Sequence, residues 1–302
     1  MSRRVLAALV LLLLLIAFPF VASGYLLGVF TIAFYFGVFA MAWDLLFGFA
    51  GEVNFGPTFL IGLGAYAAGL LNVRGWPILP AVLAGAVAAV LGGLLLALPA
   101  LRLRGPYFGL VTLVAVLLLQ QVIVIFAGVT GGEIGLSLPD VLSVDARKNY
   151  WYALAFMAVS GALLYALSRS PAGLILQAAG QDPVEAQALG FNVAKHKLAA
   201  FSISALFSGL AGALMVFYLG TASVDTVVDI SVTVQVIIAV VLGGRRTILG
   251  GILGAVFLIG VGEVLRPLGQ LSTFVVAAIA LAVILLFPDG LIGAFGRHRR
   301  QA

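Results

Sequence analysis

The feature that most constrains this chain is a run of 39 residues, from Val5 to Trp43, that contains no Asp, Glu, Lys or Arg. A helix needs about 20 mainly apolar residues to cross the hydrocarbon core of a bilayer. The run is therefore long enough for two crossings. Pro19, followed by Ser23 and Gly24, indicates where the chain turns between them.

The composition of the whole chain excludes several classes of protein. Apolar residues make up 63% of the 302 residues and charged residues 9%, against about 45–50% and about a quarter in soluble domains. So few charges leave too little polar surface for a soluble protein, and disordered chains are poor in apolar residues. Cysteine is absent, which excludes disulfides, thiolate metal sites and cysteine nucleophiles. The two histidines, His196 and His298, lie in charged segments, so no histidine-based site is expected within the membrane.

Further apolar stretches predict an all-α polytopic membrane protein with about ten hydrophobic segments in one transmembrane domain, residues 1–302. Beyond the first run, these stretches cover roughly 55–73, 77–98, 106–128, 150–168, 198–219, 230–243, 248–265 and 272–288. The segments near 55–73 and 248–265 are rich in glycine, so they are candidates for broken or re-entrant helices. Residues 48–66 and 243–259 share a glycine cluster followed by glycines at helical spacing. This similarity is consistent with an internal repeat, and it is also consistent with the general abundance of glycine in membrane helices.

The basic residues indicate the orientation. With ten crossings and a cytoplasmic N-terminus, twelve Lys and Arg residues lie on the inner side and four on the outer side, as the positive-inside rule requires. The inner group is Arg3, Arg4, Arg102, Arg104, Arg169, Lys195, Lys197, Arg245, Arg246, Arg297, Arg299 and Arg300. An uncleaved first helix is favoured over a signal peptide, because the apolar stretch is long and no A-x-A site precedes a polar region. An outer loop is expected at 129–149.

The inner loop 169–197 is predicted to contain a short helix. Asp182 can cap its N-terminus, with Pro183 at the first helical position. Glu185 in the first turn complements the helix dipole, and Gly190 is suited to the C-terminal end. A short capped helix of this kind suits a docking element for a cytoplasmic partner. The alternative is an ordinary loop whose helix lies on the lipid headgroups.

The sequence offers no enzyme constellation. It has no phosphate-binding G-x-x-x-x-G-K-[ST] motif, no H-E-x-x-H motif and no pair of intramembrane aspartates. Polar residues at membrane depth tend to face an interior, which makes a few of them candidates for lining a solute path. These candidates are Asp44, Glu52, Asn54, Gln120 and Gln121.

Each candidate also has a structural alternative. Asp44 can be a helix-end residue at the interface. Gln120 and Gln121 are adjacent, so at most one faces a path and the other is expected to bond between helices. Glu263 lies three residues before Arg266, where a local ion pair is the simplest explanation.

Several motifs resemble a known family. Glu185-Ala186-x-x-x-Gly190 resembles the EAA-type cytoplasmic loop of ABC importer permeases. Six further stretches resemble the permeases of branched-chain amino acid ABC transporters, and the M-type subunit more than the H-type. In chain order they are FGFAGEVNFGPTFLIGLGAYAAGLL at 47–71, LRGPYFGLVTL at 103–113, TGGEIGL at 130–136, ALGFNVAKHKLAAFSISALFSGLAGAL at 188–214, LGGRRTILGGILGA at 242–255 and LFPDGLIG at 286–293.

The resemblance implies a permease subunit of an ATP-driven importer in a bacterial or archaeal-type cell (inner) membrane, with both termini cytoplasmic. The implied partners are a second homologous permease, two ABC ATPase subunits and an extracytoplasmic substrate-binding protein, and no nucleic acid is involved. ATP and Mg would bind to the ATPases, so this chain would be neither an enzyme nor a cofactor-binding subunit. It would form half of the path and couple to an ATPase through the helix at 182–190. The coupling residues carried over are Asp182, Glu185, Ala186, Gly190 and Lys195.

The chain also departs from the family pattern. It has Val53-Asn54-Phe55-Gly56-Pro57 where the family usually has Ser-Leu-Gly-His, and its inner loop is less charged than usual between Gln177 and Gln181. The solute is therefore less well defined than the family. Urea, short amides and other small carboxylates are alternatives to branched-chain amino acids. A stand-alone secondary transporter or channel is an alternative class, disfavoured by the scarcity of central acidic residues, and a membrane enzyme or a structural subunit is another.

Overall fold

The computed structural model describes residues 14–100, 106–286 and 290, and most of them are helical. The main helices are α2 (Gly24–Asp44), α3 (Pro57–Val73), α4 (Ile78–Ala100), α5 (Pro106–Ile125), α7 (Ala146–Arg169), α10 (Val193–Leu219), α12 (Ile230–Gly243), α13 (Leu249–Leu265) and α14 (Gln270–Leu286). The short helices are η1 (Phe18–Phe20), η2 (Leu45–Phe49), α6 (Ala127–Thr130), α8 (Pro171–Gln181), α9 (Pro183–Ala188), α11 (Val224–Val227) and η3 (Arg266–Leu268). The strands β1 (Leu136–Ser137) and β2 (Thr221–Ala222) form one antiparallel pair.

The nine main helices coincide with nine of the ten predicted hydrophobic segments. Seven helical stretches of the described chain are long and apolar enough to cross a bilayer, and α3 is a shorter apolar helix. This confirms the all-α polytopic class. The predicted first segment lies mostly outside the described residues, as do Arg3, Arg4, Arg102, Arg104, most of LFPDGLIG and the basic residues from Arg297 onward.

Helix boundaries follow local chemistry. The turn predicted near Pro19 is confirmed, because η1 ends at Phe20 and the Ser23 side chain caps α2. The two glycine-rich segments form unbroken helices of 17 residues, α3 and α13. An irregular turn precedes each one, so the break in helical structure lies before these helices and not within them.

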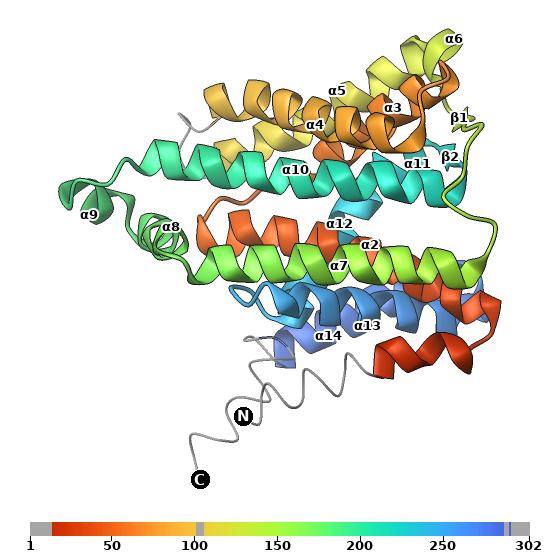
Figure 1. Cartoon of the computed structure of the whole chain (residues 1–302). Helices are drawn as coiled ribbons and strands as arrows, with labels where there is room; N and C mark the ends of the chain where they lie inside the picture. Colours follow the sequence, from red (N-terminus) through yellow and green to blue (C-terminus); the bar gives the residue numbers. More distant parts are fainter. Residues whose placement is uncertain (1–13, 101–105, 287–289, 291–302) are drawn as a thin grey trace.

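Two groups of helices make up the molecule (Figure 1). In one group α3, α4 and α10 pack tightly together, and in the other α2 packs against α7 and α13. Small residues allow the close packing of α3 on α10, since a Cβ on Gly64 would collide with the carbonyl of Gly209. Ser204 and Ser208 of α10 are buried as well.

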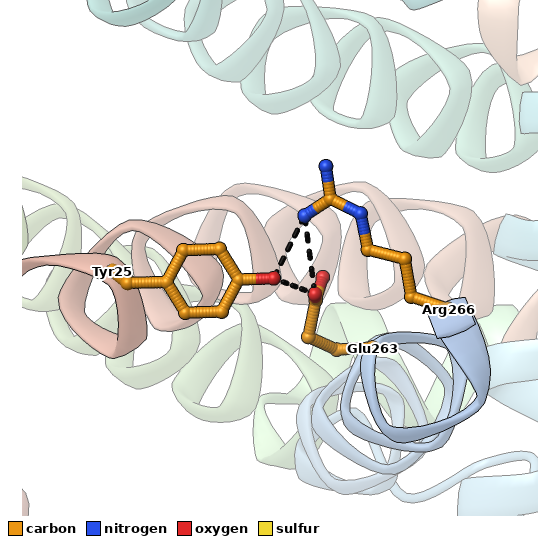
Figure 2. A network of polar contacts seen from close by, with 3 residues as sticks. All are labelled: Tyr25, Glu263 and Arg266. Carbon is orange, nitrogen blue, oxygen red and sulfur yellow. Dashed lines mark hydrogen bonds and ion pairs between the residues drawn. The ribbon is translucent and has the colours of Figure 1, made fainter.

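The two ends of the helix bundle differ. At one end, called here the α9 end, α8 and α9 project beyond α7 and α10 (Figure 1). At the opposite end, the β end, Leu136 of β1 pairs with Ala222 of β2. Figure 2 shows that Tyr25 of α2 is joined to Glu263 in the last turn of α13 and to Arg266 at the start of η3. The predicted ion pair between Glu263 and Arg266 is confirmed at 3.2 Å.

Candidate functional site

The loop between α7 and α10 folds into two consecutive short helices at the α9 end. Ser170 ends α7 in extended conformation, and its Oγ accepts a hydrogen bond from the Gly173 amide at 3.3 Å. Pro171 then occupies the first position of α8, where a missing N–H leaves no intrahelical bond unmade. A Cβ on Gly173 would collide with the carbonyl of Leu167, so α8 lies directly against the end of α7.

The helix predicted at 182–190 is confirmed as α9. Asp182 Oδ1 accepts hydrogen bonds from the amides of Val184 at 2.8 Å and Glu185 at 3.0 Å. Such a cap typically contributes about 1 kcal/mol. Gly190 follows the helix with a φ of 89°, a left-handed conformation that favours glycine.

The two sides of α9 have different environments. Ala186 is buried against Ala179 of α8 and Val193 of α10, so a small residue is needed there. The opposite side is open, with Glu185 exposed and Val184 and Leu189 exposed to 76% and 74%. Exposed apolar groups beside a carboxylate are typical of a protein-binding surface.

Lys195 lies in the first turn of α10, and its side chain is exposed. Its backbone amide donates to Asn192 Oδ1 at 2.9 Å, which caps α10. The roles of Asp182, Glu185, Ala186, Gly190 and Lys195 in coupling remain predictions, although their geometry is now defined.

Two glycines bring α8 into backbone contact with the turn that follows α2 and η2. A Cβ on Gly51 would lie 2.6 Å from the carbonyl oxygen of Gly180, and a Cβ on Gly180 would lie 2.5 Å from the carbonyl oxygen of Phe49. Gly51 also has a φ of 71°. Both positions therefore require glycine, and α8 rests on the main chain of this turn with no side chain between them.

An ion pair reinforces the same contact. Lys197 Nζ, from the first turns of α10, lies 2.5 Å from Glu52 Oε1. Both side chains are mostly buried, with 13% and 18% of their surfaces exposed. Partial burial reduces the screening that weakens surface pairs. Glu52, a predicted path residue, is thus placed against α10 at the edge of the coupling loop.

Asp44, another predicted path residue, is fully buried at the end of α2. Its carboxylate accepts three backbone N–H bonds: Oδ1 from Arg246 at 2.9 Å, and Oδ2 from Thr247 at 3.1 Å and Ile248 at 2.9 Å. Arg246 and Ile248 have φ values of 63° and 55°, which are unusual for residues other than glycine. The carboxylate therefore holds a strained turn in place just before α13 begins.

Asn54 is buried in the turn before α3. Its backbone carbonyl accepts a hydrogen bond from Trp43 Nε1 at 2.6 Å, and its Oδ1 accepts one from the Gly56 amide at 2.8 Å. Within the described chain its Nδ2 has no hydrogen-bond partner. The next residue, Phe55, donates its amide to Thr112 Oγ1 of α5 at 3.0 Å.

The two adjacent glutamines have different environments, and their role in a solute path stays a prediction. Gln120 Nε2 donates to the carbonyl of Val228 at 3.4 Å, which links α5 to the segment just before α12. Gln121 is exposed on α5.

These contacts form a continuous connection from the exposed loop into the helix bundle. It runs from α9 to α8, through Gly180 and Gly51 to η2, and then through Asp44 to the turn before α13. Across the described residues, no three His, Cys, Asp or Glu side chains lie together in a way that would hold a metal ion.

A family model described as the permease component of branched-chain amino acid transport systems matches residues 25–288. The chain belongs to this family. The permease LivM of Escherichia coli (strain K12), named for high-affinity branched-chain amino acid transport, is 28% identical over 320 residues, covering 93% of this chain and 73% of the relative. A probable LivM of Methanocaldococcus jannaschii is 23% identical over 74% of this chain and 77% of its own length.

A relative with a different printed role matches a shorter part of the permease. LsrC of Klebsiella pneumoniae, named as an autoinducer 2 import permease, is 30% identical over 57% of this chain and 53% of its own length. No solved structure matches the chain.

Sequence reasoning missed two residues of this connection, Lys197 and Arg246, as members of specific contacts. A signal for Lys197 was present: it lies four residues after Val193 and four before Phe201, both of which are buried on α10. That spacing puts a lysine on the inward face of a helix, where it needs a counter-charge. The bond from Arg246 Nε to the Gly48 carbonyl, at 2.7 Å, has no comparable signal because 198 residues separate the two.

Proposed function

We propose that this permease subunit imports branched-chain amino acids as half of the path of an ATP-driven transporter. The observation that carries the proposal is the family match over residues 25–288. Relatives named for branched-chain amino acid transport align with most of the chain, whereas the relative named for autoinducer 2 aligns with 57% of it. A small apolar amino acid is therefore the favoured solute, and the stand-alone carrier is not favoured.

The proposed complex contains a second permease, two ABC ATPases that hold ATP and Mg, and an extracytoplasmic binding protein. Two features of this chain support that division of labour. Its sequence has no phosphate-binding motif. The exposed side of α9 also presents Val184, Glu185 and Leu189 as a compact surface on which another protein can bind.

We place the α9 end in the cytoplasm, with both termini on that side, because most of the basic residues then lie inside. The β end then faces outward. Its loop carries exposed Glu133 and Ile134, the latter 95% exposed, which are available to a binding protein.

In the proposed mechanism, ATP-driven closure of the ATPases displaces α9. Because Ala186 is buried against α8 and α10, α9 carries these helices with it. The Gly180–Gly51 contact and the Glu52–Lys197 pair then pass the displacement to the turn before α3. Backbone contact transmits motion with little loss, because no flexible side chain lies between the two segments.

The test uses the complex purified with its partners from native membranes and reconstituted into vesicles. ATP-dependent uptake of leucine is expected for the wild-type complex. Reversing the charge on the exposed α9 surface with Glu185→Arg should lower that uptake by about tenfold, equivalent to about 1.4 kcal/mol of docking free energy. Uptake by the neutral variant Glu185→Gln should lie between that of the wild-type complex and that of Glu185→Arg.

The controls separate docking from folding. Glu185 is exposed and makes no side-chain cap, so both variants should insert and purify at wild-type yield. Wild-type uptake in Glu185→Arg would remove the docking role of α9. Leucine uptake that does not require ATP would contradict the importer itself.

A further inference from the structure

Most of the exposed surface of the helix bundle is apolar. On α4, exposed side chains recur at every fourth position, and each is 54–75% exposed. They are Leu79, Leu83, Val87, Leu91 and Leu95. A stripe of this kind is suited to hydrocarbon. The exposed positions in the middle of α7, such as Val159 and Leu163, are apolar as well.

One face differs from this pattern. Ser231 and Gln235 are exposed on α12, where their spacing of four places them on the same side of the helix. Gln121 is exposed on α5. We call these three residues the polar face. Leu117, Val122 and Val234, each 43–48% exposed, accompany them.

The two parts of the polar face are linked, because α5 and the segment just before α12 meet over α3. A Cβ on Gly62 of α3 would lie 2.6 Å from Val228 Cγ2 and 3.1 Å from Leu119 Cδ2. The bond from Gln120 to the Val228 carbonyl connects the same two segments. Gln121, the neighbour of Gln120 on α5, therefore lies close to the segment that leads into α12.

Gln235 is exposed, but it lies far from both ends of the bundle when position is measured along the bundle axis. Thr233 of α12 and Thr58 of α3 share a hydrogen bond of 2.7 Å between their hydroxyls, and a Cβ on Gly93 of α4 would lie 3.1 Å from Leu60 Cδ2 of α3. Both α4 and α12 run antiparallel to α3. Gln235 lies two residues after Thr233 on α12, and Leu95 lies two residues after Gly93 on α4. The two side chains therefore lie at closely similar depth along the bundle. One is an exposed amide and the other an exposed leucine.

An exposed amide at this depth costs free energy in lipid, where nothing accepts or donates its hydrogen bonds. We propose that the polar face is a wall of the water-filled solute path and faces the second permease subunit across it. This rests on the proposed function and deepens it by assigning the path to one side of the chain. Uncharged amides among valine and leucine suit a small amino acid with an apolar side chain, because the wall hydrates the solute without binding it through charge.

The absence of cysteine allows a direct test, since single cysteines can be introduced into an otherwise wild-type chain. The variants are Gln235→Cys on the polar face and Leu95→Cys as its depth-matched control. Each is reconstituted in the whole complex and treated with a charged methanethiosulfonate reagent, which reacts with thiolates. Gln235→Cys should react at least about tenfold faster, because a thiol ionises in water and not in hydrocarbon.

Labelling after denaturation in detergent confirms that both thiols are present. If Gln235→Cys fails to assemble, Ser231→Cys one turn away and Gln121→Cys on α5 provide the same readout. Equal labelling rates for the polar-face cysteines and for Leu95→Cys would overturn the proposal. So would a failure of the reagent to label any of the three polar-face cysteines in the folded complex. The labelling requires no solute, so a failure of leucine uptake in the wild-type complex would count against the proposed function without affecting this result.

Discussion

Two turns at the α9 end invite comparison, because each leads into a 17-residue apolar helix and each contains glycines. The turn before α13, residues 244–248, is fixed to α2 by the Asp44 carboxylate through three backbone bonds. The turn before α3, residues 50–56, is instead connected to α8 by Gly51 and to α10 by Glu52. Asn54 and Phe55 also tie the second turn to α2 and α5. Only the second turn, however, is joined directly to the loop that is proposed to move.

The difference shows how similar turns can serve different purposes. A buried carboxylate that accepts three N–H groups holds one conformation firmly, since each lost bond leaves a buried or partly buried donor unsatisfied. The connection of the second turn to α8 and α10 consists of one backbone contact and one ion pair, so it has fewer bonds to break. The first arrangement suits an anchor and the second suits transmission of motion.

The largest effect is expected from Asp44→Ala, which breaks the anchored turn. One buried and two partly buried N–H groups would lose their acceptor, at about 1–3 kcal/mol for the buried one and less for the others. We expect the folded permease to be lost from membranes, as measured by purification yield and thermal stability in detergent. Asp145→Ala removes a carboxylate of the same type at the exposed cap of α7, and should cost only about 1 kcal/mol. Similar stability of the two variants would contradict the anchor.

The next effect is expected from Gly51→Ala in the second turn. Its Cβ would lie 2.6 Å from the Gly180 carbonyl oxygen, and its φ of 71° disfavours alanine. Leucine uptake should fall about tenfold while much of the folded protein remains, because α8 is displaced and the helix bundle is not. Gly128→Ala is the control, since its Cβ would meet nothing within 4 Å. Equal uptake by the two variants would show that the backbone contact is dispensable.

A smaller effect is expected at the ion pair. Lys197→Met and Glu52→Gln should each lower uptake by a few-fold, because either change leaves a mostly buried charge unpaired. The double variant that combines Glu52→Gln with Lys197→Met should lose less uptake than the sum of the two single losses, with a coupling energy of about 1 kcal/mol. Strictly additive losses across this double-mutant cycle would indicate that the two residues act independently.

Much of the fold was predictable from sequence because hydrophobic length and helix caps are local signals. Segment boundaries, the cap at Asp182 and the Glu263–Arg266 pair all depend on residues within a few positions of each other.

The connections between segments were not predictable, since they depend on register across the bundle. Asp44 was recognised as a polar residue at a helix end, but its three partners lie about 200 residues further along the chain. Glu52 and Lys197 are 145 residues apart. Gln235 was not singled out, because only the packing of α12 on α3 and α13 shows that it remains exposed at depth.

The central claim is that α8 drives the turn before α3 through the Gly180–Gly51 contact. The most direct test is the number of ATP molecules hydrolysed per leucine imported, measured in vesicles that contain the complete complex with Gly180→Ala. The account predicts that hydrolysis stimulated by the binding protein persists while leucine uptake falls, so that the ratio rises well above the wild-type value. An unchanged ratio, with uptake and hydrolysis either both normal or both reduced in proportion, would contradict it.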